Sequence, residues 1–418
     1  MMHYNMNKIE KTCSNGLHVI LVHKPEFKKS LFMCVTPAGG FDVMQDVNGQ
    51  TVQYRSGCAH YLEHQMFRLN GEDVTQAFAN MQAQTNAFTS YTETAYFFST
   101  TADIYKPLDL LLRFVETLDI DEKSVEKERG IILSEYDMYQ QSPEHRLLTE
   151  TWNSLYEKNP IRIDVLGNRE DISNMTVKDL EAFYYNNYDP SVLTLIGITG
   201  KEIEPIFEYV ENHQKNYPSK LNGKIVRHME KEDDKVVREE SISHMDITLP
   251  YVCVGYKMKP EKDIQKALKT ELCVQLYLDS LFSPLNPEYQ KWLDGRIIGQ
   301  MQGVECSFSK EASNILFYAQ SEKIDEFVKL VDRLIEKMKT EGIDKEIFEV
   351  LVPGNVAQNI RGLENYENVC MDLLKAHVEG YDFWEHFDCI QDITMEEINE
   401  ICHTLDYSNK TVTKVFPK

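Results

Sequence analysis

The strongest constraint on this chain is a short run at residues 60–64, which reads His60-Tyr61-Leu62-Glu63-His64. The surrounding stretch has a helical pattern, and positions i, i+3 and i+4 of a helix share one face, so His60, Glu63 and His64 should point into one small volume. Two neutral imidazoles suit Zn²⁺, and a carboxylate held beside them could take a proton from an attacking water molecule. The run predicts a metal site. A chain with 12 histidines produces such a run by chance in roughly a few per cent of cases. The run alone is therefore weak evidence for a metal site, and a third ligand elsewhere in the sequence would strengthen it.

A second helix, predicted between residues 124 and 140, supplies candidates for that ligand. Its apolar residues are spaced among charges as in an amphipathic helix. Glu128 and Glu135 are two helical turns apart, so their side chains lie on one face. One carboxylate could bind the metal while the other orients a ligand or the substrate. The alternative is that both are solvated charges on a surface helix, but the histidine run upstream favours the metal site.

Together the two segments resemble the insulinase/pitrilysin family of zinc peptidases, the inverzincins, which includes the mitochondrial processing peptidase. The resemblance is carried by residues 60–64 and by Glu128-Arg-Gly-Ile-Ile-Leu-Ser-Glu135, and the flanking segments 57–67, 85–90 and 166–172 agree with it. It spans nearly all of the first 200 residues and fades in the second half. The chain is most similar to short, two-domain bacterial members of the type encoded as an active and an inactive pair.

The resemblance implies a role for each candidate residue. Three side chains would hold one zinc ion per chain: His60, His64 and Glu135. Glu63 would be the general base, and Glu128 would support catalysis without binding the metal. Asn86 and Ala87 match the substrate-binding strand of the family, and Phe88 follows them as a third candidate. A peptide would add to this strand through main-chain hydrogen bonds. The alternative for the segment is an ordinary turn followed by a strand.

The chain is predicted to have an α+β fold with two homologous αβ domains, each a mostly antiparallel sheet packed by helices. The N-terminal zinc-binding peptidase domain is expected at 1–211 and the C-terminal domain at 241–418. A polar linker at 212–240, which includes Pro218 and Asn222, would join them. The helix at about 261–282 that corresponds to the histidine helix carries no such run, so only one half can hold zinc.

Hydrophobic periodicity predicts the main elements of both halves. In the first half we expect strands at 17–23, 30–36, two within 86–100 and one at 193–199, and helices at about 103–118, 121–140 and 176–187. In the second half we expect strands at 250–256 and about 314–320, and helices at about 261–282, 323–340, 344–360 and 394–404.

Charge and composition narrow the partners and the compartment. The net charge of −23 argues against nucleic acid and anionic membranes, whose recognition requires clustered Lys and Arg. It would instead favour basic peptides as substrates. The sequence has no apolar run long enough to span a bilayer and no N-terminal signal-like apolar region. The nine cysteines show no C-x-x-C spacing, which indicates a reducing compartment, so we expect a cytoplasmic protein.

The second half departs from self-sufficient relatives of the resembled family. Those relatives carry an Arg-x₆-Tyr pattern that reaches the substrate carbonyl. Here Tyr289 precedes Arg296, so the order is reversed. Each missing oxyanion donor would cost roughly a few kcal/mol of transition-state stabilisation. We therefore expect a dimer with a homologous subunit that lacks the zinc motif but keeps the Arg and Tyr. The alternative is a homodimer in which Tyr289 or Arg296 contacts the substrate.

These features predict a zinc-dependent endopeptidase that cleaves unfolded peptides inside a chamber formed by two subunits. One alternative is a non-catalytic peptide-binding or assembly subunit of a processing-peptidase-like complex, although such subunits typically lose motif residues that this chain keeps. Another is a protein with a structural zinc. A structural site is closed by a fourth protein ligand, and the sequence offers none nearby.

Overall fold

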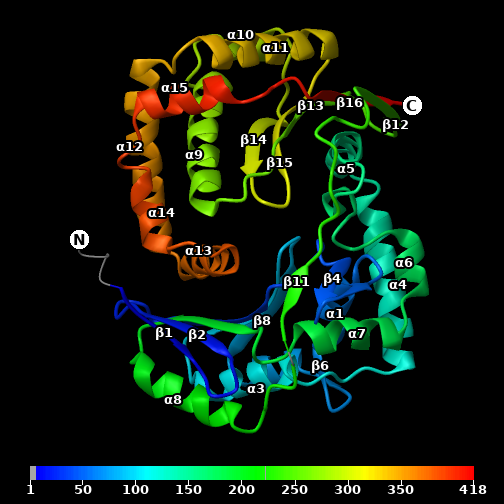
Figure 1. The fold of residues 1–418 in the computed structure, drawn as a ribbon, viewed down its shortest axis with the longest axis vertical. Helices are drawn as coiled ribbons and strands as arrows, with labels where there is room; N and C mark the ends of the chain where they lie inside the picture. The colour runs from blue at the N-terminus through cyan, green and yellow to red at the C-terminus, as the bar shows by residue number, and fades with distance from the viewer. Residues whose placement is uncertain (1–5, 222) are drawn as a thin grey trace. The chain divides into compact units, whose positions relative to one another are not determined.

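The computed structural model describes residues 6–221 and 223–418. Residues 1–5 of the predicted N-terminal domain and Asn222 of the predicted linker lie outside the described residues. The chain forms two compact units that interleave along the sequence (Figure 1). Unit 1 contains the residues up to Tyr136, together with Ile163–His228 and Gly362–Val378; unit 2 contains Asp137–Arg162, Met229–Arg361 and Glu379–Lys418.

Unit 1 is built on a six-stranded sheet in which only β2 and β10 run parallel. In spatial order the strands are β1 (Asn7–Thr12), β2 (His18–His23), β10 (Thr194–Thr199), β3 (Ser30–Thr36), β9 (Thr94–Thr100) and β8 (Ala83–Thr89). β3 and β10 are buried along their whole length, as expected for central strands with both faces covered. β8 has β9 on one side and is the edge strand of this sheet.

Helices cover both faces of the sheet in unit 1. One face packs on a core that includes Phe32, Phe98 and Phe114. The helices of the unit are α1 (Cys58–Met66), α2 (Thr75–Asn80), α3 (Tyr105–Val115), α4 (Glu122–Tyr139), α6 (Arg169–Asn174), α7 (Val177–Asn187), α8 (Ile203–Gln214) and α13 (Tyr366–Glu379), with α4 and α13 reaching just beyond its bounds. Short strands complete it: β4 (Met44–Val47), β5 (Gln50–Gln53), β6 (Arg68–Leu69), β7 (Glu72–Asp73) and β11 (Ile225–Arg227).

Unit 2 is built on a five-stranded sheet. In spatial order its strands are β12 (Glu240–Met245), β16 (Lys410–Pro417), β13 (Tyr251–Met258), β15 (Ser313–Gln320) and β14 (Gln302–Phe308). Its helices are α5 (Pro143–Leu155), the short 3-10 helix η1 (Pro160–Arg162), α9 (Ile264–Leu281), α10 (Tyr289–Asp294), α11 (Ile324–Thr340), α12 (Lys345–Gly362), α14 (Phe383–Cys389) and α15 (Met395–Thr404). Its main core lies between the sheet, α9 and α11, and includes Phe282, Phe317 and Phe327.

The two sheets repeat one topology. In each, the last strand of the chain segment (β10 or β16) pairs in parallel with an early strand (β2 or β12) and antiparallel with the next (β3 or β13). Two further antiparallel strands follow outward, β9 and β8 in unit 1 and β15 and β14 in unit 2. α1 and α9 occupy equivalent places in the chain, before β8 and β14. The predicted α+β fold with two homologous αβ domains is confirmed.

Packing explains why the units interleave along the chain. α5 lies within the histidine-bearing half in sequence, between α4 and α6, yet Leu147 and Leu155 pack with Cys253 of β13 in unit 2. Gly255 of β13 leaves room for α5, because a Cβ there would lie 3.0 Å from the Thr151 methyl carbon. α13 lies between α12 and α14 in sequence but belongs to unit 1. None of the helices in the described part of the chain has the length and apolar composition of a membrane-spanning segment.

Candidate metal centre

The start of α1 is fixed by a close backbone approach. Gly57 caps the helix with φ 82°, and a Cβ at this position would lie 2.1 Å from the carbonyl oxygen of Leu166, so only glycine fits. Ser56 beside it donates from its hydroxyl (2.6 Å) and its backbone N–H (3.0 Å) to Asp171. These contacts set where the histidine helix begins.

Two polar contacts tie α1 to α4. The hydroxyl of Tyr61, a buried residue inside the histidine run, donates to the carbonyl oxygen of Val125 over 2.5 Å. The side-chain amide of Gln65 donates to the carbonyl oxygen of Ser124 over 3.2 Å. Because both acceptors lie in the first half of α4, the carboxylates further along that helix are brought over the histidines.

His60, His64 and Glu135 converge on one point. The Nε2 atoms of His60 and His64 lie 3.7 Å and 3.5 Å from the same Oε2 atom of Glu135. One ligand atom from each side chain lies within 4.8 Å of the others. Burial, together with the neighbouring His64, lowers the pKa of His60 to about 3, so its imidazole is neutral at pH 7. Two imidazole nitrogens and one carboxylate are a donor set that fits Zn²⁺ in an open, catalytic-type site.

Glu63 points toward the edge strand of the sheet. Its Oε2 atom accepts a hydrogen bond from the hydroxyl of Thr89, at the end of β8, over 2.7 Å. Burial raises the pKa of Glu63, and the Thr89 hydrogen bond and His64 oppose that shift. The carboxylate is therefore held in one direction by a neutral donor, beside the three metal-ligand candidates.

Glu128 lies behind His64. Its Oε2 atom is 3.4 Å from Nδ1 of His64, and its Oε1 atom is 3.6 Å from the ammonium of Lys127. Since Nε2 of His64 faces Glu135, Glu128 contacts the opposite side of the ring. A carboxylate in this place fixes the orientation of a metal-binding imidazole.

The three predicted substrate-binding residues lie on β8, and the alternation of a strand separates them. Ala87 packs against the helix-covered core, on the same face as Thr89. Asn86 and Phe88 point to the other face, where the Phe88 ring lies 6.4 Å from that of Phe97 on β9. The three residues therefore share an edge strand, but their side chains do not line one pocket.

The equivalent edge in unit 2 is closed by side chains. On β14, the N–H groups of Cys306 and Phe308 donate to the side chains of Gln275 and Glu271 of α9, over 3.2 Å and 2.8 Å. The Gln275 amide also donates to the carbonyl oxygen of Val304 over 3.4 Å. Among the hydrogen bonds of the described residues, α1 provides no such cover for the backbone of β8. Of these two equivalent edges in the described part of the chain, β14 is covered by side chains of its neighbouring helix and β8 is not, so β8 is the one that can accept an added strand.

Thr89 is the contact that the sequence analysis missed, because its partner is Glu63 on a different element. We expect Thr89→Val to lower peptide turnover roughly tenfold, since a hydrogen bond to a charged group contributes about 1.5 kcal/mol or more. Steady-state kinetics on an unfolded peptide measure this effect, and the zinc content should stay unchanged. Thr51→Val is the matched control, because Thr51 also donates to a carboxylate, Asp46, over 2.7 Å but lies on β5. Equal rates in the Thr89 variant and the wild type would contradict the assigned contact.

The reversed Tyr289 and Arg296 pair of unit 2 is engaged locally. The Tyr289 hydroxyl accepts from the Gln302 amide over 2.6 Å. The Arg296 guanidinium pairs with Glu322 at 3.0 Å, from a backbone conformation with φ 57°. Each side chain already has a polar partner within its own unit.

A two-domain αβ protein with a His-His-Glu cluster on a helix pair is the arrangement of a zinc-peptidase-like protein. Residues 51–169 match the family model "Insulinase (Peptidase family M16)", and residues 174–352 match "Peptidase M16 inactive domain". The chain belongs to the insulinase family, peptidase family M16.

Similar proteins agree with this assignment. The chain is 29% identical over 409 residues to the "uncharacterized zinc protease YmfH" of Bacillus subtilis, covering 97% of this chain and 95% of that one. It is 27% identical over 213 residues to the mitochondrial-processing peptidase subunit beta of Neurospora crassa, covering 50% of this chain and 43% of that one. A crystal structure of a putative M16-like peptidase from Alicyclobacillus acidocaldarius superposes with a TM-score of 0.93 at 26% identity, covering 99% of each chain.

Proposed function

We propose that this protein is a zinc-dependent endopeptidase that acts on unfolded peptides. One observation carries the proposal: Thr89, on the open edge strand β8, donates to Glu63, which lies beside the converging side chains of His60, His64 and Glu135. A peptide that adds to β8 as a further strand would pass next to both the base and the metal ligands. The names of the bacterial relatives as zinc proteases support the same chemistry.

The residues divide the reaction between them. When bound by His60, His64 and Glu135, zinc supplies a Lewis acid that polarises the scissile carbonyl. Glu63 takes a proton from the attacking water and returns it to the leaving amine. Burial raises the pKa of Glu63, which makes its carboxylate a stronger proton acceptor. Glu128 keeps the His64 ring in place.

The substrate has to be extended, because strand addition exposes its main chain along the whole of β8. Main-chain recognition selects little for sequence, and the net charge of −23 favours basic peptides over acidic ones. All nine cysteines are free thiols, which supports the proposed cytoplasmic location. We propose this peptidase role ahead of a non-catalytic assembly role, because the second role requires neither the base nor its donor Thr89.

We propose that a homologous subunit completes the site and encloses the substrate in a shared chamber. Tyr289 and Arg296, the side chains that a homodimer would offer to a substrate carbonyl, have local partners in Gln302 and Glu322. A second chain with an Arg and a Tyr in the expected order would supply the missing oxyanion donors. The relative from Neurospora crassa is itself named as one subunit of a processing peptidase.

We expect the isolated chain to cleave an unfolded lysine-rich peptide at least ~10²-fold more slowly than a mixture with the homologous subunit, because an oxyanion donor contributes roughly 10²–10³ in turnover. The measurement is turnover of the peptide by each chain alone and by the mixture. The mixture containing Glu63→Gln is the control for catalysis by this chain. Turnover on the order of 1 s⁻¹ by the isolated chain would rule out an obligatory partner, and rapid cleavage of a folded globular protein would contradict strand addition.

A further inference from the structure

α13 is held on the sheet of unit 1 at both of its ends. At the N-terminal end, the Lys24 ammonium donates to the carbonyl oxygen of Leu363, and the Tyr366 ring packs edge-on against Phe27 at 6.1 Å. At the C-terminal end, Nε2 of His377 lies 2.7 Å from the Thr194 hydroxyl of β10. The helix thus crosses the β2 side of the sheet, where it covers residues that face away from the main core.

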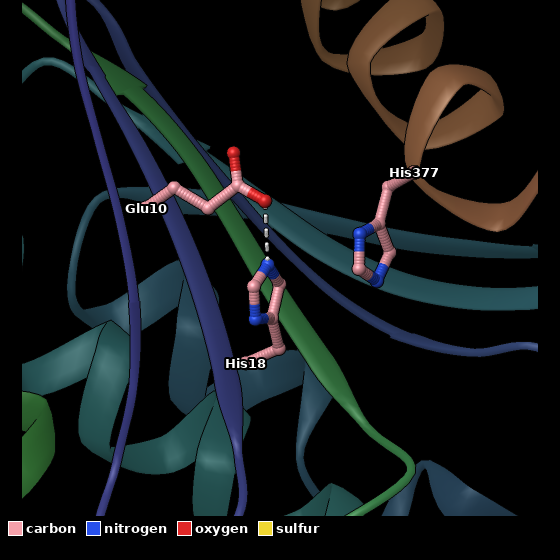
Figure 2. Close-up of side chains that lie close together, drawn as sticks. All are labelled: Glu10, His18 and His377. Carbon is pink, nitrogen blue, oxygen red and sulfur yellow. Dashed lines mark hydrogen bonds and ion pairs between the residues drawn. The ribbon is translucent and has the colours of Figure 1, made fainter. Parts of the chain in front are cut away.

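Strand register places a row of polar side chains under the C-terminal end of α13. His18 of β2 is opposite Thr12 of β1 and Thr194 of β10. Glu10 is two residues from Thr12 along β1, so it lies on the same face, diagonal to His18. These positions bring a carboxylate and an imidazole together beside the His377 ring (Figure 2).

The three side chains form a compact donor set. Oε1 of Glu10 lies 3.0 Å from Nε2 of His18. The rings of His18 and His377 are stacked, with centroids 4.7 Å apart and planes 9° apart. One ligand atom from each of Glu10, His18 and His377 lies within 4.8 Å of the others, a limit that the His60, His64 and Glu135 cluster also meets.

We propose that Glu10, His18 and His377 form a second metal site, which binds a divalent transition cation of the zinc type. Two imidazole nitrogens and one carboxylate oxygen suit Zn²⁺, Co²⁺ or Ni²⁺, whereas Ca²⁺ and Mg²⁺ prefer oxygen ligands throughout. The hydroxyls of Thr12 and Thr194 lie 3.4 Å from Nδ1 of His18 and 2.7 Å from Nε2 of His377. They are placed to orient the rings while the remaining ring nitrogens bind the cation.

The site is open to solvent, and a neighbouring charge sets its strength. The Glu10 side chain is 41% exposed, so a cation can enter from the sheet edge. Lys8 pairs with the other carboxylate oxygen, Oε2, at 2.8 Å and leaves Oε1 toward His18. Its positive charge opposes a bound cation, so the affinity is expected to be lower than at the buried cluster.

Binding at this site would fasten α13 to the hairpin of β1 and β2. Two ligands come from the hairpin and one from the helix, so a bound cation bridges segments that are far apart in sequence. The consequence is mechanical rather than catalytic: the cation stabilises the docked position of a helix whose neighbours in sequence, α12 and α14, belong to unit 2. It also stands independently of the proposed peptidase chemistry.

Titration of the metal-free full chain with Co²⁺, followed by visible absorption, tests the second site. We expect two equivalents of Co²⁺ to bind to the wild type. Either His18→Gln or His377→Gln should bind only one equivalent. Loss of a group that merely supports a metal ligand weakens binding about 10–100-fold, so loss of a ligand should weaken binding at the altered site by at least ~10²-fold. His23→Gln, at the other end of β2, is the matched control and should keep two equivalents. His60→Ala should also fall to one equivalent, but by loss of the other site, so failure of the peptidase centre and failure of this site give different patterns.

Hydrogen exchange supplies a second readout that a folding defect would not mimic. In His60→Ala, added Zn²⁺ should slow amide exchange in α13, and this effect should vanish when His377→Gln is combined with it. Lys8→Gln should tighten binding, because it removes the opposing charge. Two equivalents in both His18→Gln and His377→Gln, or α13 exchange that does not respond to Zn²⁺, would overturn the proposal.

Discussion

Glu63→Gln should retain zinc and bind peptide but cleave it at least ~10²-fold more slowly, the lower end of the usual contribution of a general base. Glutamine keeps the size of the side chain and can still accept the hydrogen bond from Thr89, which is 2.7 Å from the carboxylate in the native chain. What it loses is the capacity to take a proton from water. Because no side chain outside the reacting group is displaced, the defect should appear in kcat rather than in KM.

Turnover by purified chain with its partner, zinc content and peptide binding should be measured on the same preparation. Glu122→Gln provides the control, since this exposed glutamate begins α4 and is remote from the histidines in sequence. An unchanged kcat in Glu63→Gln would eliminate the proposed mechanism. Loss of zinc equal to that of a histidine variant would instead move Glu63 into the metal-ligand set.

Loss of zinc from the main site should follow His60→Ala and Glu135→Gln. Structural zinc binding in peptides contributes about 10–16 kcal/mol, so removal of one of three protein ligands should cost several kcal/mol of affinity. Glu128→Gln should weaken binding by only about 10–100-fold, as expected for a residue that contacts the far side of the His64 ring. The three variants thus separate direct ligands from supporting groups.

Elemental analysis after dialysis is the measurement, and each variant should be made together with His377→Gln so that the exposed second site contributes nothing. Circular dichroism checks that the fold survives, because His60 is buried. Retention of a full equivalent of zinc by His60→Ala would disprove its assignment as a ligand. Equal losses of zinc in Glu128→Gln and Glu135→Gln would contradict the assignment of Glu135 as a ligand and Glu128 as a supporting group.

Local pattern was enough to predict much of the fold. The helices expected at 103–118, 121–140 and 176–187 are α3, α4 and α7, and the strand expected at 30–36 is β3. Each of these elements buries an apolar stripe or run whose period can be read in the chain. α7 also carries a capping box between Thr176 and Asp179, which is a strong start signal.

The elements that were not predicted lack such a pattern or depend on a neighbour. β1 is a polar edge strand that is mostly exposed, so it shows no alternation of buried residues. β14 has a buried residue only at its last position, Phe308, and its outer edge is satisfied by side chains of α9. α5 packs in unit 2 although it lies within the first half of the sequence. These outcomes depend on partners that are distant in the chain.

The sequence by itself determined the residues of the candidate metal centre, because His60, Glu63 and His64 share one helical face at fixed spacing and Glu128 and Glu135 share a face of a second helix. Tertiary structure alone decided that α4 lies over α1, that Thr89 holds Glu63, and that β8 is open while β14 is closed. It also alone brought His377 to Glu10 and His18. The physical reason is that a helix fixes the relation of side chains within a turn or two, whereas contacts between elements depend on how the whole core packs.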